Sequence, residues 1–127
     1  MSEYVLDASA LLALLNSEKG AELVQGLLPQ AVISTVNLAE VVTRLSAVGM
    51  PEDQIRDALA YLGLEILPFD EEQAFQSGLL YAHTQPLGLS LGDRACLALA
   101  QVTDATAVTS DRTWKDLDIG VGLKLIR

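Results

Sequence analysis

The sequence contains one cysteine, Cys96, and one histidine, His83, among its 127 residues. With a single cysteine, no disulfide can form within the chain, which fits a reducing compartment. Cys96 lies in the apolar run CLALA, where we expect a small buried hydrophobic residue and not a reactive thiol. A metal site rich in nitrogen and sulfur ligands, such as a zinc site, cannot be assembled from these two residues.

The chain also lacks a long apolar run and a basic leader. Its first stretch, MSEYVLDASALLALLNSE, has acidic residues on both sides of an apolar segment that is too short to span a membrane. No glycine-rich turn follows any candidate strand, which argues against a dinucleotide-binding module. We therefore expect a cytoplasmic protein with no membrane contact.

Positive charge is scarce. Eight Lys and Arg residues face seventeen Asp and Glu residues, and the formal net charge is −9. Such a balance repels a polyanion at long range, so charge alone argues against nucleic acid as a ligand. Divalent cations bound by the acids would invert the field around their site and weaken that objection.

Half of the residues are hydrophobic, and 127 residues suffice for a single domain, residues 1–127, with one core. Short β-branched runs alternate with longer helical stretches, which predicts an α/β fold with a mainly parallel sheet. Right-handed crossovers would place helices on both faces of that sheet. The candidate strands are Tyr4–Leu6, Ala31–Ser34, Glu65–Phe69, Ala105–Thr109 and Leu123–Ile126.

Two helix starts carry capping signals. Ser9 is expected to cap a helix over Ala10–Leu15. Ser90 and Asp93 have the spacing of a capping box, which would open the helix that contains ACLALAQ.

Four acids that are distant in the sequence are expected at one edge of the sheet. Asp7 closes the first candidate strand, and Asp111 lies just beyond the fourth. Asp93 begins the helix that leads into the fourth strand, and Glu40 lies in the first turns of the helix after the second. Carboxylates so close together raise one another's pKa values unless a cation compensates them. Oxygen ligands favour Mg²⁺ or Mn²⁺, so the sequence predicts a magnesium or manganese site with a capacity for phosphodiester hydrolysis.

Each acid also has an ordinary structural alternative. Asp7 can form a turn before its helix, and Asp111 can cap a short helix over Arg112–Lys115. The capping box with Ser90 could by itself account for Asp93. Glu40 can pair with Arg44, four residues further along the same helix.

Six further residues are candidates for supporting roles. Hydroxyls or a fifth carboxylate would orient ligands at the periphery, and cations would contact substrate phosphates. Helix capping and simple charge balance are the alternatives. The peripheral candidates are Ser9, Thr109 and Asp116, and the candidates for substrate binding are Arg94, Arg112 and Lys115.

Four segments resemble the PIN-domain ribonucleases, and most closely the VapC-like toxins of type II toxin–antitoxin modules. The segments are VLDASALLALL around Asp7, STVNLAEVVTRL around Glu40, LSLGDRACLALA around Asp93 and AVTSDRTW around Asp111, in the family's order. The resemblance implies a three-layer α/β/α sandwich with a five-stranded sheet. It also implies RNA cleavage with Mg²⁺ or Mn²⁺, with these four acids as metal ligands and catalytic residues.

The resemblance implies partners as well. They are an RNA substrate, a cognate antitoxin and a second copy of the chain in a homodimer. We expect the antitoxin to bind the pair of helices over Thr35–Val48 and Glu52–Leu62. These helices contain more apolar residues than a single core-facing stripe requires. The alternative function is a catalytically silent PIN-like module that binds RNA or protein.

Two other acidic α/β classes fit the sequence less well. A phosphorelay receiver domain needs an acidic pair after its first strand, where only Asp7 is present. A phosphatase of the haloacid dehalogenase type needs a second aspartate two residues after the first, at the position of Ser9.

Overall fold

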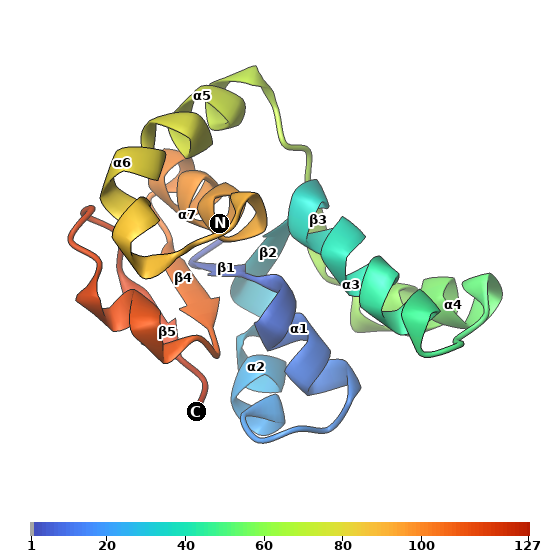
Figure 1. Ribbon diagram of the computed structural model, residues 1–127. Coiled ribbons are helices and arrows are strands. Elements are labelled where there is room, and N and C mark those ends of the chain that lie inside the picture. The colour runs from blue at the N-terminus through green and yellow to red at the C-terminus, as the bar shows by residue number, and fades with distance from the viewer. Residues whose placement is uncertain (1) are drawn as a thin grey trace.

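Five short apolar runs form the strands of one sheet (Figure 1). The structure is a computed structural model that describes residues 2–127. The strand order is β3-β2-β1-β4-β5, and every neighbouring pair is parallel. All carboxyl ends therefore lie at the same edge. The strands are β1 (Tyr4–Leu6), β2 (Ala31–Ser34), β3 (Glu65–Leu67), β4 (Thr106–Thr109) and β5 (Leu123–Leu125).

Successive residues of a strand point to opposite sides, and in this sheet both sides carry buried apolar residues. Helices therefore cover both faces of the sheet. Val5 packs with buried residues of α7, whereas Leu6 packs with α1 and α2. In Figure 1, the helices labelled α5, α6 and α7 lie at the left of the view, and α3 and α4 project from the sheet at the right. The helices are α1 (Ala8–Leu15), α2 (Ala21–Leu27), α3 (Thr35–Ala47), α4 (Glu52–Leu62), α5 (Glu71–Leu79), α6 (Tyr81–Thr84) and α7 (Leu91–Thr103), with 3₁₀ turns η1 (Leu28–Gln30), η2 (Gln85–Leu87) and η3 (Arg112–Asp116).

The predicted element boundaries are correct with small differences. The third strand ends at Leu67 and not at Phe69, because Pro68 has no N–H to donate to the ladder. The predicted cap of the first helix is wrong: Asp7 caps α1 by accepting a hydrogen bond from the Ala10 N–H, and Ser9 lies inside the first turn. The capping box of Ser90 and Asp93 is confirmed.

No helix within residues 2–127 has both the length and the apolar character needed to cross a bilayer.

The loop between α1 and α2 packs tightly against the segment that follows β5. Gly20 has a φ of +100°, which L side chains rarely adopt. A Cβ at this position would lie 2.7 Å from the carbonyl oxygen of Ile126 and 3.0 Å from its Cβ. Only glycine therefore permits this contact between the two segments.

We expect Gly20→Ala to lower the free energy of unfolding by about 1–3 kcal/mol, because it adds both backbone strain and a backbone clash. The matched control is Gly26→Ala within α2, where a Cβ meets nothing within 4 Å and alanine favours the helix. Chemical denaturation measures both variants. Equal unfolding free energies for the two variants would contradict the tight packing at Gly20.

Candidate functional site

Asp7 lies where β1 ends, with 4% of its surface exposed. Its Oδ1 accepts hydrogen bonds from the Ser9 hydroxyl at 2.7 Å and the Ala10 N–H at 2.8 Å. Its Oδ2 accepts one from the Thr109 hydroxyl at 2.5 Å. Burial raises the pKa of Asp7 to about 6 despite these hydrogen bonds, and the charge of Asp93 adds to the increase. A buried carboxylate of this kind is a candidate functional group.

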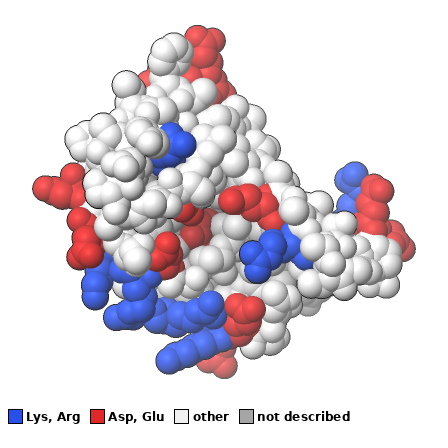
Figure 2. Space-filling view, viewed as in Figure 1, with Lys and Arg blue, Asp and Glu red and all other residues white. Residues whose placement is uncertain are grey.

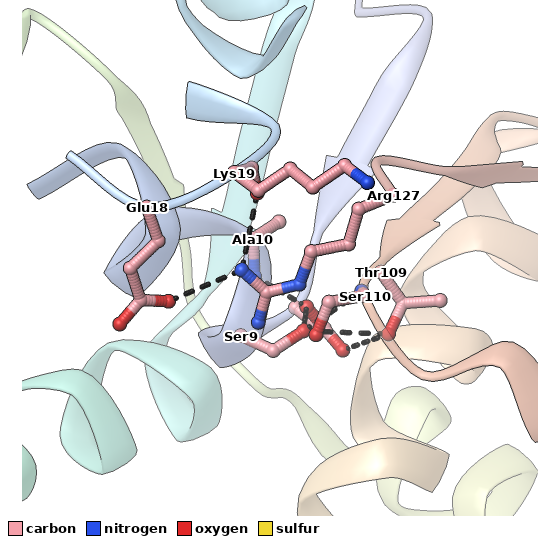
Figure 3. A network of polar contacts seen from close by, with 8 residues as sticks. Ser9, Ala10, Glu18, Lys19, Thr109, Ser110 and Arg127 are labelled. Atoms are coloured by element: carbon pink, nitrogen blue, oxygen red, sulfur yellow. Dashed lines mark hydrogen bonds and ion pairs between the residues drawn. The ribbon is translucent and has the colours of Figure 1, made fainter. Parts of the chain in front are cut away.

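The hydroxyls around Asp7 also join two segments that follow neighbouring strands (Figure 3). The Ser110 N–H donates to the Ser9 hydroxyl at 3.0 Å, and the Asp111 N–H donates to the Thr109 hydroxyl at 3.0 Å. Each hydroxyl thus donates to Asp7 and accepts from the loop after β4. Ser9 and Thr109, predicted as peripheral residues, fix the position of the Asp7 carboxylate.

Glu40 is positioned by two residues that the sequence did not identify as part of the site. The Asn37 amide donates to Glu40 Oε1 at 2.8 Å and to the Gly92 carbonyl at 3.0 Å, so it connects α3 to the start of α7. A Cβ on Gly92 would overlap the Glu40 carboxylate. The sequence signal for Gly92 was a glycine in the first turn of an otherwise good helix, where glycine is unfavourable.

Asp93 and Asp111 each use one oxygen to cap a helix. Asp93 Oδ2 accepts from the Ser90 N–H at 2.9 Å. Asp111 Oδ1 accepts from the N–H and the hydroxyl of Thr113, at 3.0 and 2.8 Å. Within residues 2–127, Asp93 Oδ1, Asp111 Oδ2 and Glu40 Oε2 accept no hydrogen bond. The capping roles of Asp93 and Asp111 are therefore compatible with a second role as ligands, whereas the ion pair between Glu40 and Arg44 is not formed among the described residues.

The four acids line one cavity of about 870 Å³. Burial raises the pKa of the nearby Cys96 thiol, and the negative charges of Asp7, Asp93 and Glu40 raise it further. Among the described residues, no three acidic, histidine or cysteine side chains are arranged to enclose an ion as they stand. Mg²⁺ does not require such a cage, because it usually takes one or two carboxylates and keeps several waters. Carboxylate oxygens without a protein partner among residues 2–127, lining one cavity, thus fit Mg²⁺ or Mn²⁺.

None of the three cations predicted for substrate binding is among the residues that line the cavity. Arg94 donates to the Ser77 carbonyl at 3.1 Å, and its guanidinium carbon lies 5.4 Å from the centre of the Tyr81 ring. Its charge therefore serves the packing of α7 against α5 and α6, and the structure does not support the predicted substrate contact. Arg44 and Arg127 line the cavity instead.

Three further candidates lie on η3. Arg112, Lys115 and Asp116 are exposed and are not among the residues that line the cavity. Asp116 therefore has no observed contact with the acidic site. Trp114, on the same turn, is buried in the core with Leu117.

Residues 4–120 match the family model described as the PIN domain. The chain belongs to the PIN-domain family. The predicted family and the predicted PIN-like α/β/α fold are both confirmed. No curated protein matches the chain.

Solved structures share this PIN fold along nearly the whole chain. The DNA-bound VapBC of Salmonella typhimurium matches with a TM-score of 0.79 at 19% identity, covering 100% of both chains. A toxin–antitoxin complex of Klebsiella pneumoniae matches with 0.75 at 22% identity, covering 98% of both. VapBC-5 of Mycobacterium tuberculosis matches with 0.61 at 25% identity, covering 100% of this chain and 99% of the other.

We expect Gly92→Ala to weaken Mn²⁺ binding by about tenfold or more, because the new methyl group displaces the Glu40 carboxylate. Gly78→Ala in α5 is the matched control, since a Cβ there meets nothing within 4 Å. Titration calorimetry with Mn²⁺ alone compares the two variants. The positioning role of Gly92 is wrong if both variants bind the ion as the parent protein does.

The raised pKa of Asp7 predicts a pH-dependent loss of stability in metal-free protein. The folded state retains the Asp7 proton more strongly than the unfolded state, so its advantage is full below the usual pKa of 3.8 and is lost as pH rises through about 6. The total change is up to about 3 kcal/mol. Asp7→Asn should remove it. Urea denaturation in EDTA at pH 4.5 and pH 7.5 tests this, and identical pH profiles for parent and variant would contradict it.

Proposed function

We propose that this PIN-domain chain is a metal-dependent endoribonuclease, a hydrolase of RNA phosphodiester bonds that acts as the toxin of a toxin–antitoxin module in the cytoplasm. One observation carries the proposal: carboxylates from four separate segments line a single cavity at the carboxyl edge of the sheet. Family membership supports nuclease chemistry.

Asp7, Glu40, Asp93 and Asp111 would hold Mg²⁺ or Mn²⁺. When bound, the ion lowers the pKa of a coordinated water and neutralises charge on the scissile phosphate. The protein keeps the carboxylates in position before substrate arrives. Ser9 and Thr109 fix Asp7, while the Asn37 amide fixes one oxygen of Glu40 and leaves the other free.

The partner that we propose is an antitoxin that occupies an apolar groove between α3 and α4. Several solved structures with this fold are VapBC or toxin–antitoxin complexes. The groove has a volume of about 770 Å³ and is bordered by Leu38, Val42, Met50, Ile55, Leu59 and Ile66. An antitoxin complex in which both helices stay fully solvated would contradict this assignment. The homodimer expected from the resemblance stays a prediction.

The decisive experiment incubates the purified protein with total RNA and Mn²⁺ or Mg²⁺. We expect cleavage that EDTA abolishes and that Asp7→Asn reduces by at least about 100-fold, because the lost ligand removes several kcal/mol of transition-state stabilisation. Asp104→Asn is the matched control: Asp104 is at the opposite end of α7, and asparagine tolerates its left-handed backbone.

Cleavage that survives EDTA or Asp7→Asn would exclude the metal–carboxylate mechanism. Folded, antitoxin-free protein that binds RNA but cleaves none of many RNAs would instead favour the silent binding module.

A further inference from the structure

Cations gather beside the acidic cavity although the chain is strongly acidic. Figure 2 shows Lys and Arg side chains along the lower left edge of the molecule, over the region where the chain ends and the loop between α1 and α2. Only eight Lys and Arg residues are present in the whole sequence. We name three of them, Lys19, Arg112 and Arg127, the basic rim.

The basic rim is held together by specific contacts from three segments. Arg127 Nη1 donates to the Lys19 carbonyl at 3.0 Å, and Arg112 Nη1 donates to a main-chain oxygen of Arg127 at 3.0 Å. The preceding residue, Ile126, is buried, and its N–H donates to the Thr109 carbonyl at 3.0 Å. Its tight contact with Gly20 brings the loop that carries Lys19 against the segment that carries Arg127. The rim is therefore a built feature of the fold.

Some nitrogens of the rim have no partner among the described residues. Arg127 forms an ion pair with Glu18 at 3.3 Å, but the two side chains are 35% and 44% exposed, and exposed pairs of this kind contribute little. Within residues 2–127, Arg127 Nε and Nη2 and the side-chain nitrogen of Lys19 make no hydrogen bond. In Figure 3 the Lys19 and Arg127 side chains lie beside each other and extend in opposite directions, with the Arg127 guanidinium next to the Ser9–Thr109 network. Cationic side chains with nitrogens that have no protein partner can bind an anion.

Arg127 places the basic rim next to the candidate metal site, because it lines the same cavity as the four acids. We propose that Lys19, Arg112 and Arg127 bind the phosphates of the RNA strand next to the phosphate that is cleaved. This inference rests on the proposed ribonuclease function. The rim would orient the strand without reading its sequence, because phosphate contacts carry no base information.

RNA binding by a non-cleaving protein tests the rim directly. In the Asp7→Asn background with Mg²⁺, fluorescence anisotropy follows a labelled 12-nucleotide single-stranded RNA across KCl concentrations. We expect Arg112→Gln with Arg127→Gln to weaken binding about tenfold near 0.1 M salt. The slope of log affinity against log salt should flatten by about 1.4, since each phosphate contact on a single strand contributes about 0.7.

The matched control is Arg56→Gln, because Arg56 is an exposed cation on α4 whose partner is Glu52 at 2.8 Å. Affinity and salt slope equal to those of the control would overturn the rim, as would absence of measurable RNA binding in the Asp7→Asn parent. Cleavage by the unmodified protein is measured separately. If it cleaves RNA while the double variant binds like the control, the ribonuclease proposal is supported and the proposed role of the rim is wrong. If it cleaves nothing while the double variant binds RNA more weakly, the basic rim binds RNA phosphates but the proposed ribonuclease function is wrong.

Discussion

The structure depends on the burial of one carboxylate, that of Asp7, at the end of the central strand. Hydrogen bonds from Ser9, Ala10 and Thr109 satisfy it, and these donors belong to α1 and to the end of β4. The carboxylate thus caps a helix and aligns two loops. It remains costly to bury, since its pKa is raised to about 6 without a cation. The carboxylate that organises the edge of the sheet is therefore also the group that a nearby cation would stabilise in its ionised form.

The topology and the four acids were predictable because they follow from local rules. Alternating strands and helices predict a parallel sheet, and residues at the carboxyl ends of parallel strands meet at one edge. Asp7 and Asp111 follow adjacent strands, so their proximity required only the strand order. The roles of Asn37 and Gly92 were not predictable, because a contact between α3 and α7 depends on how the two helices pack.

Arg94 and Arg127 show the same limit more clearly. Proximity in sequence to Asp93 predicted a substrate contact for Arg94, but its position on α7 directs the guanidinium to Ser77 and Tyr81. Arg127 carried no signal in the sequence. It lines the cavity from a segment whose preceding residue, Ile126, packs against Gly20 of the α1–α2 loop. A net charge of −9 describes the whole chain and does not reveal where its few cations lie, so it could not predict their local arrangement.

The capping and ligand roles of the acids are not alternatives. Asp93 and Asp111 each give one oxygen to a helix start, which fixes the side chain, and each retains an oxygen without a protein partner among residues 2–127. A carboxylate held in this way loses little conformational entropy when it binds a cation, because the ordering was completed during folding. A free aspartate at the same place would have to be ordered by the ion itself. The helix caps that argue against a metal site when each acid is considered alone are therefore part of what would make such a site bind well.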